Sequence, residues 1–169
     1  MPLHAFVDES FSGDYVVVAA LVPAGKVNAA RAALRAVLRP GQRRIHFKDE
    51  RPPRKDRVLS VIDHLEVTAT VYVTTNERKA RGVCLERMVP DLAAAGVSRL
   101  VLERDESLAR FDRQVLARLA REYCPDLVYE HQRAHSDLLL CVPDAIAWCW
   151  AKGGHWRDRV AGCTTEIRV

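Results

Sequence analysis

The sequence predicts an α/β fold in which a mixed sheet, opened by an antiparallel hairpin, is flanked by helices. Two β-rich segments near the N-terminus are joined by a short turn, and strands alternate with helices from Glu66 onward. The composition is that of a globular protein, with 49% hydrophobic and 28% charged residues in a chain of 169. This length predicts one domain, residues 1–169, around a sizeable core.

The N-terminal hairpin is predicted from two runs of β-branched and aromatic residues, Leu3–Asp8 and Tyr15–Val22. The segment between them, Ser10–Asp14, has the residues of a tight turn. We therefore expect the two strands to pair with each other in antiparallel orientation.

A basic helical insertion is predicted next, at about residues 26–65. Its first helix should cover Lys26–Leu38, where apolar residues recur at helical spacing before Pro40. A loop follows, and Pro52 leads a second helix. Between residues 39 and 57 the chain has eight Lys or Arg residues and three acidic ones, although its total net charge is only +4.

This basic stretch fits a phosphate-rich partner, so we expect nucleic acid to bind there. The candidate contacts are Arg43, Arg44, Lys48, Arg51 and Arg54. The alternative is a solvated, arginine-rich face without a ligand.

From Glu66 onward, strands that alternate with helices imply parallel pairing and a sheet covered on both faces. Strands are expected at Val67–Thr74, Ser98–Glu103 and Leu127–His131, and helices at Arg78–Ala95, Leu108–Tyr123 and Asp144–Lys152. Pro143 lies inside an apolar run, so the last helix either begins at this proline or kinks there. In the first case Asp144 lies in the first helical turn.

Three carboxylates stand where the chain is otherwise apolar. Asp8 ends the first strand, Glu103 ends a central strand, and Asp144 interrupts the most apolar segment. Parallel strands would bring Asp8 and Glu103 to one sheet edge, and a packed helix could add Asp144. Such a cluster favours Mg²⁺ or Mn²⁺, which can support phosphodiester hydrolysis, so these are the candidate catalytic and metal-binding residues. The alternative for each is a turn or cap residue.

Four further residues are second-rank candidates. Glu9 would point away from Asp8 unless the turn begins at Glu9 and frees it to reach a metal. Asp137 could join the cluster or cap a helix. His46 and Lys48 alternate with apolar residues and could contact a phosphate or transfer a proton, unless they lie on a solvated edge strand. The C-terminal region also contains three tryptophans, Trp148, Trp150 and Trp156. They either pack against other helix residues or stack on nucleic-acid bases.

The order of strands and acids resembles the ribonuclease H-like fold, in which Asp8, Glu103 and Asp144 fall on the acidic positions in turn. More closely, Phe6–Ser10 and Leu140–Ala147 resemble the bacterial and phage family called domain of unknown function 3800. That resemblance implies a ribonuclease H-like fold over nearly the whole chain. The sequence departs from the family pattern at Phe11-Ser12, which precede Gly13, and at Cys141, which replaces the usual Gln.

The remaining features narrow the class of protein. The five cysteines are odd in number and irregularly spaced, which favours reduced core residues in a cytoplasmic protein. No apolar run approaches the roughly 18 residues of a membrane span, so no membrane partner is expected. The function predicted is a metal-dependent nuclease. The alternative is a catalytically inactive ribonuclease H-like module that binds nucleic acid or protein, and the sequence leaves the oligomeric state open.

Overall fold

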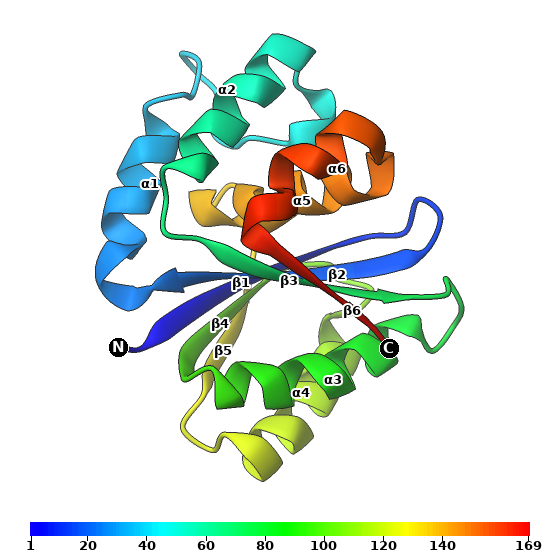
Figure 1. The fold of residues 1–169 in the computed structure, drawn as a ribbon. Coiled ribbons are helices and arrows are strands. Elements are labelled where there is room, and N and C mark those ends of the chain that lie inside the picture. The colour runs from blue at the N-terminus through cyan, green and yellow to red at the C-terminus, as the bar shows by residue number, and fades with distance from the viewer.

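One six-stranded mixed sheet organises the structure, a computed structural model that describes residues 1–169. The strand order is β5-β4-β1-β2-β3-β6 (Figure 1). The strands are β1 (Leu3–Ser10), β2 (Tyr15–Pro23), β3 (Thr68–Thr74), β4 (Val97–Glu103), β5 (Val128–Gln132) and β6 (Thr164–Arg168). The helices are α1 (Val27–Arg35), α2 (Pro52–Asp63), α3 (Ala80–Ala94), α4 (Ala109–Tyr123), α5 (Cys141–Lys152) and α6 (Gly154–Val160).

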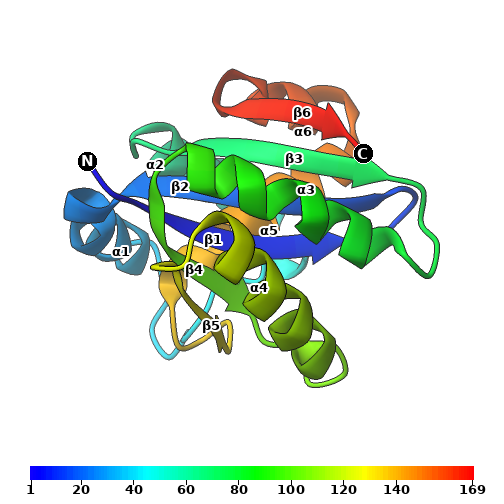
Figure 2. The ribbon, with the colours of Figure 1, turned by 90° about the horizontal axis from the view of Figure 1, so that it is seen from below.

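Strand β1 lies in the middle of the sheet and has neighbours of both kinds (Figure 2). It pairs with β2 as the predicted antiparallel hairpin, with Asp8 opposite Val18. On its other side it runs parallel to β4, and the last registered pair is Val7 with Leu102. The residues that follow this pair are Asp8 and Glu103, so the parallel register brings the ends of the two strands together.

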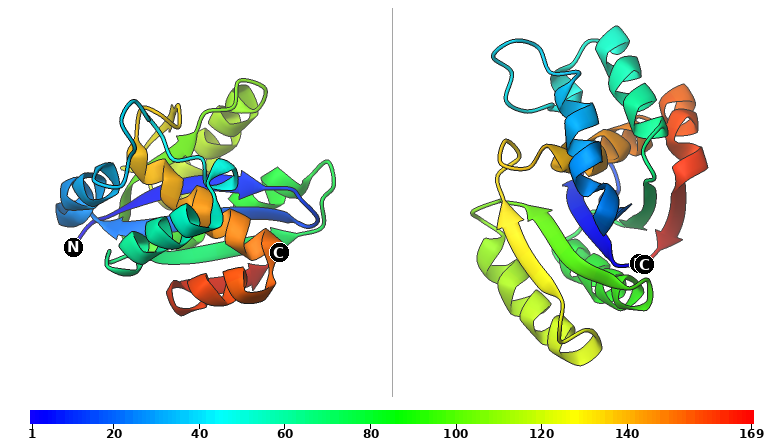
Figure 3. Two further views of the ribbon diagram at one scale, coloured as in Figure 1. Left: turned by 90° about the horizontal axis from the view of Figure 1, so that it is seen from above. Right: turned by 90° about the vertical axis from the view of Figure 1, so that its left-hand side faces the viewer.

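Helices cover both faces of the sheet, as the sequence predicts (Figures 1 and 3). Helices α1, α2, α5 and α6 share a core of 29 buried residues with one face, on which Phe6 of β1 lies. Helices α3 and α4 share a second core of 19 buried residues with the other face, on which Val7 lies. Alternate residues of a strand therefore belong to different cores.

The last part of the chain was not predicted, and its sequence shows why. Helix α6 follows α5 after Gly153 and begins at Gly154, and the positive φ angles of these two glycines, 73° and 55°, change the direction of the chain. Strand β6 pairs with β3 at the sheet edge and is largely exposed, so it lacks an apolar alternation. Pro143 lies in the first turn of α5, which places Asp144 in that turn as well. No helix has both the length and the apolar character needed to cross a bilayer.

A buried acidic residue holds the segment between β2 and β3 together. Glu50 is only 5% exposed, and its carboxylate accepts hydrogen bonds from Gln42 at 2.7 Å and from Arg54 at 3.4 Å. The ammonium of Lys55, also buried, donates to the carbonyl oxygen of Glu50. The loop that precedes α2 is therefore held in one conformation by internal hydrogen bonds.

We expect the packing of helix α2 in the core to be required for the stability of the whole protein. Leu59 is 1% exposed, so Leu59→Ala should lower the free energy of unfolding by about 2–5 kcal/mol. The exposed neighbour provides the control, because Ser60→Ala should change it by less than about 0.5 kcal/mol. Urea denaturation measures both variants, and equal values would contradict the packing of α2.

Candidate active site

Strand alternation places two of the three candidate carboxylates on the same face of the sheet. Asp8 lies two residues after Phe6, and Glu103 lies two residues after Val101, and both apolar residues belong to the core under α5. Because side chains two apart in a strand share a face, both acids point toward the layer that contains α5. The parallel pairing of β1 with β4 sets them beside each other.

Helix α5 brings the third carboxylate to this edge. It packs on β1 and β2, and Asp144 lies in its first turn. One Asp144 oxygen, Oδ2, accepts a hydrogen bond of 2.9 Å from the backbone N–H of Phe47, in the segment before α2. A cavity of about 470 Å³ is lined by all three candidate acids, Asp8, Glu103 and Asp144.

The charges in this cavity repel one another. The pKa of Asp8 is raised well above its usual value, first by burial and then by the negative charges of Glu103 and Asp144. The pKa of Asp144 is also raised by burial, although the Phe47 N–H and the nearby charges of His46 and Arg44 oppose the shift. Burial and repulsion therefore outweigh the effect of the positive charges near Asp8 and Asp144.

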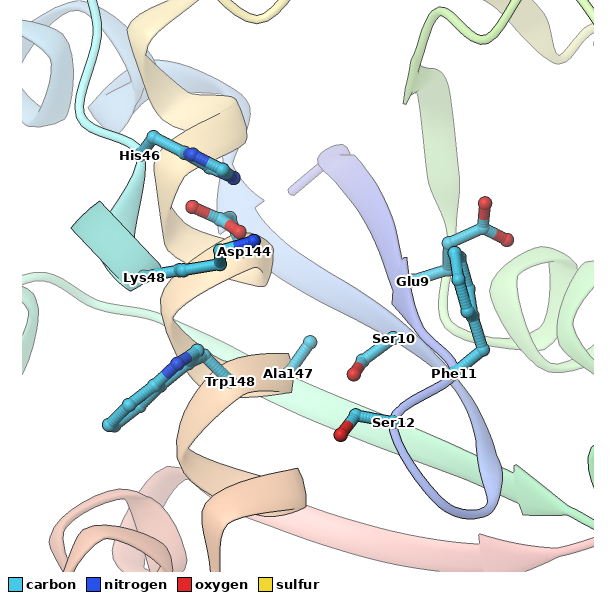
Figure 4. Close-up of a pocket in the computed structure, with 9 residues that line it drawn as sticks. All are labelled: Glu9, Ser10, Phe11, Ser12, His46, Lys48, Asp144, Ala147 and Trp148. Carbon is cyan, nitrogen blue, oxygen red and sulfur yellow. The ribbon is translucent and has the colours of Figure 1, made fainter.

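His46 and Lys48 lie beside this cluster. His46 lines the carboxylate cavity, and together with Lys48 and Asp144 it also lines a neighbouring cavity of about 420 Å³ (Figure 4). The two residues do not lie in an edge strand, because Phe47–Asp49 form a 3-10 turn. Nδ1 of His46 lies 2.8 Å from Oδ2 of Asp49, which fixes the orientation of the imidazole ring.

The carboxylates of the two second-rank acids are paired with arginines. Glu9 lines both cavities, but strand β1 continues through Ser10, so its side chain points to the opposite face from Asp8 and its carboxylate pairs with Arg81. The carboxylate of Asp137, 4% exposed, accepts hydrogen bonds of 2.6 and 3.1 Å from Arg31 and caps the turn at Leu139. In this structure Asp137 acts as a cap, the alternative that its sequence position had left open.

Of the five candidate nucleic-acid contacts, four are accessible and one is used within the protein. Arg43, Lys48 and Arg51 are exposed, and Arg44 is half-buried. The guanidinium of Arg54, in contrast, donates a hydrogen bond of 2.8 Å to the carbonyl oxygen of Val37 and also pairs with Glu50. Arg54 thus fastens the loop, and the other four side chains are the ones placed for contact with a ligand.

The structure adds residues that sequence reasoning did not select. Arg104, Asp105 and Glu106 line the carboxylate cavity. Ser10 at the end of β1 and Phe11 and Ser12 in the β1–β2 turn line one cavity or both. The Asp105 carboxylate accepts hydrogen bonds from the backbone N–H and the hydroxyl of Ser107, in the turn before α4. The one sequence signal in this region is Phe11-Ser12, which depart from the family pattern before Gly13.

The donor set suits a hard divalent cation. The candidate ligands offer only carboxylate oxygens, and a cation would offset the burial and the repulsion that together raise the pKa of Asp8. No three acidic, histidine or cysteine side chains of the chain are spaced as a ready-made metal site. Rotation of the carboxylate side chains would therefore have to accompany metal binding.

On the opposite face, a buried ionic network lies directly behind the site. Arg81 of α3 pairs with Glu9 of β1 and with Asp112 of α4, and His131 of β5 lies 3.0 Å from Asp112. Burial alone would raise the pKa of Asp112, but the hydrogen bonds from Arg81 and His131 outweigh it and lower that pKa. The Tyr15 hydroxyl donates to Glu9 and completes the network.

Solved structures show that this architecture is a ribonuclease H-like fold. Matches include a chain of the PCNA:ribonuclease HII complex from Archaeoglobus fulgidus, with a TM-score of 0.60, 12% identity, and coverage of 95% of this chain and 77% of that chain. Ribonuclease H2 from Pyrococcus horikoshii gives a TM-score of 0.55 and 14% identity, over 95% and 74% of the two chains.

A mutant of the Bst ribonuclease HIII gives a TM-score of 0.54 and 15% identity, over 85% of this chain and 50% of that chain. No family model matches the sequence, and no curated protein matches it. At these identities the similarity shows the fold alone.

Removal of one negative charge from the cavity should stabilise the metal-free protein. A carboxyl group whose pKa is raised by folding contributes stability at low pH that is lost as the pH rises. In chelator at pH 7, Asp8→Asn should therefore melt at a higher temperature than the wild type, by about 2–4 °C for each 1 kcal/mol gained. The difference should shrink as the pH approaches the ordinary range of aspartate.

Thermal unfolding followed by circular dichroism measures this effect. Asp126→Asn, in an exposed turn, removes the same charge elsewhere and should leave the midpoint nearly unchanged. A lower midpoint for Asp8→Asn than for the control would show that the Asp8 charge is not under repulsion.

The Arg81 network should be required for stability. Arg81→Ala leaves Asp112, 1% exposed, without its main counter-charge, so the free energy of unfolding should fall by about 3–5 kcal/mol. Arg87→Ala on the same helix removes an exposed pair with Asp91 and should cost no more than about 1 kcal/mol. Chemical denaturation compares the two, and similar losses would rule out a structural role specific to Arg81.

Proposed function

We propose that the protein is a divalent-metal-dependent nuclease that hydrolyses phosphodiester bonds of DNA or RNA. The observation that carries this proposal is the convergence of Asp8, Glu103 and Asp144, from two adjacent strands and a helix, on one cavity. The pKa of Asp8, raised by burial and then by the charges of Glu103 and Asp144, supports it further, because a cation would offset both effects.

In this proposal Asp8, Glu103 and Asp144 hold Mg²⁺ or Mn²⁺. When bound, such an ion supplies an activated water and neutralises charge on a phosphate. The exposed Arg43, Lys48 and Arg51 and the half-buried Arg44 attract the phosphate backbone toward the cavity.

His46 is the candidate for proton transfer. Its Nδ1 is engaged by Asp49 at 2.8 Å, which leaves Nε2 to exchange a proton with a substrate or product oxygen in the cavity that it lines. Asp49 is a positioning residue in this scheme, because it acts through the imidazole and does not itself line the cavity.

Three further points belong to the same proposal. We infer that residues 1–169 are one domain with residues 26–65 as an insertion, that the chain belongs to the domain of unknown function 3800 family, and that it acts in the cytoplasm. The short segments Phe6–Ser10 and Leu140–Ala147 support the family, and the cysteines support the location, since Cys84, Cys141 and Cys149 are buried and unpaired.

A second candidate function is a module that binds nucleic acid or protein without cleaving a substrate. One observation favours it, namely that the carboxylates as placed form no ready-made metal site. In that case binding should depend on salt and be indifferent to divalent metal.

The nuclease proposal is tested with single-stranded, duplex and hybrid substrates in chelator, Mg²⁺ and Mn²⁺. The wild type should cleave at least one of them only with metal, and Asp8→Asn, Glu103→Gln and Asp144→Asn should each lower the rate at least about 100-fold, because each removes a ligand charge. Asp126→Asn, remote from the cavity, should retain the wild-type rate.

A binding measurement accompanies the activity. Mg²⁺ or Mn²⁺ should raise the melting temperature of the wild type and not that of Asp8→Asn, because a ligand that binds only the folded state stabilises it. Absence of both cleavage and stabilisation, with nucleic-acid binding retained, would favour the non-catalytic module.

A further inference from the structure

An exposed aromatic side chain stands at the edge of the carboxylate cavity. Phe11, at the start of the β1–β2 turn, is 64% exposed, and it lines both the carboxylate cavity and its neighbour. The other large apolar side chains that are exposed lie away from both cavities, and they are Met1, Val83, Phe111, Tyr123 and Val128. Single exposed apolar residues are common, but this one borders the proposed reaction centre.

The neighbouring cavity is a groove between the β1–β2 turn and α5. On one wall the hydroxyls of Ser10 and Ser12 point toward α5, and on the other wall Ala147 leaves room for a ligand (Figure 4). Neither serine hydroxyl makes a hydrogen bond within the protein, whereas Lys48 extends a cationic group at the margin. At about 420 Å³ the groove falls within the range of about 300–1,000 Å³ typical of small-ligand sites.

The tryptophans nearby are held in place by contacts within the protein. The Lys55 ammonium lies 4.7 Å from the ring centroid of Trp148, whose edge contacts include Trp156 at 5.4 Å. The guanidinium of Arg157 lies 4.5 Å from the ring of Trp150. Trp148 lines the groove and is half-buried, whereas Phe11 is 64% exposed, so Phe11 is the more accessible of the two aromatic rings that line the groove.

In Figure 4 the Phe11 ring lies beside Glu9, on the side of the turn away from the two serine hydroxyls. We propose that Phe11 stacks on the base of one unpaired nucleotide of a nucleic-acid strand, while Ser10 and Ser12 contact the adjoining part of the strand in the groove. This inference rests on the proposed function, since the phosphate next to the stacked nucleotide would lie at the carboxylate cavity. An aromatic face, two free hydroxyls and a cation match the bases, polar edges and phosphates of a nucleic-acid strand.

The inference selects a class of substrate. In a duplex each base is covered by its neighbours and its pairing edge is occupied, so only an unpaired base can offer a free face to Phe11. The preferred substrate is therefore a single strand, or an end or loop with unpaired nucleotides, and not a continuous duplex.

Binding of a labelled oligodeoxythymidylate, about 15 nucleotides long to cover the usual site sizes, tests this inference against a blunt duplex. Fluorescence anisotropy is recorded in chelator and in Ca²⁺, over a series of salt concentrations. Phe11→Ala should weaken single-strand binding by about 5- to 100-fold, the range expected for the loss of one base stack, and Phe11→Trp should retain it.

Two further measurements show whether the loss of affinity in Phe11→Ala comes from lost stacking or from lost phosphate contacts. The dependence of binding on salt should be unchanged in Phe11→Ala, because no phosphate contact is lost. A 2-aminopurine placed in the strand should be quenched on binding to the wild type and not to Phe11→Ala. Phe111→Ala is the matched control, because Phe111 is 42% exposed and lies outside both cavities.

The outcomes distinguish the two proposals. If the wild type binds the single strand and Phe11→Ala binds it equally well, or loses affinity equally for the blunt duplex, the stacking inference is overturned and the proposed function is untouched. If the wild type binds neither probe in either condition, the proposed function fails and the inference fails with it.

Discussion

The parallel pairing of β1 with β4 is the constraint on which both the sheet and the candidate site depend. The hairpin supplies β1 with one neighbour that is close in sequence, but β4 comes from residues 97–103, far along the chain. Its register sets Val7 beside Leu102, and the acids that follow are forced together at the point where the strands leave the core. The charge repulsion at Asp8 is therefore a consequence of topology, and the apolar pairs that precede it must compensate for its cost.

The opposite face of the sheet shows how that edge is kept rigid. Arg81 links the end of β1, through Glu9, to Asp112 of α4, and His131 connects the same carboxylate to β5. Buried ionic groups of this kind add little net stability compared with apolar packing, but they fix the relative positions of the elements that they join. Two adjacent acids in β1 thus have different environments: Asp8 lies near other carboxylates, whereas Glu9 is paired with Arg81.

Much of this arrangement could be read from local patterns. Asp8 and Glu103 stand out because each follows an apolar strand, and Asp144 because it follows a proline in an apolar run. The ribonuclease H-like fold was predicted from the same features and is confirmed by the solved structures. Local patterns could not show that Arg54 turns inward to Val37 or that Arg31 holds Asp137, because those partners are distant in sequence. The groove at Phe11 depends on how the turn lies against α5, which is a tertiary feature with no periodic signal.

The hydrogen bond from the Phe47 N–H to Asp144 joins the segment between β2 and β3 to the edge of the sheet where Asp8 and Glu103 lie. Phe47 is fully buried, so the position of this N–H is set by the core and not by a free surface loop. A change in the packing around Phe47 would therefore be felt at the Asp144 carboxylate, which accepts that hydrogen bond.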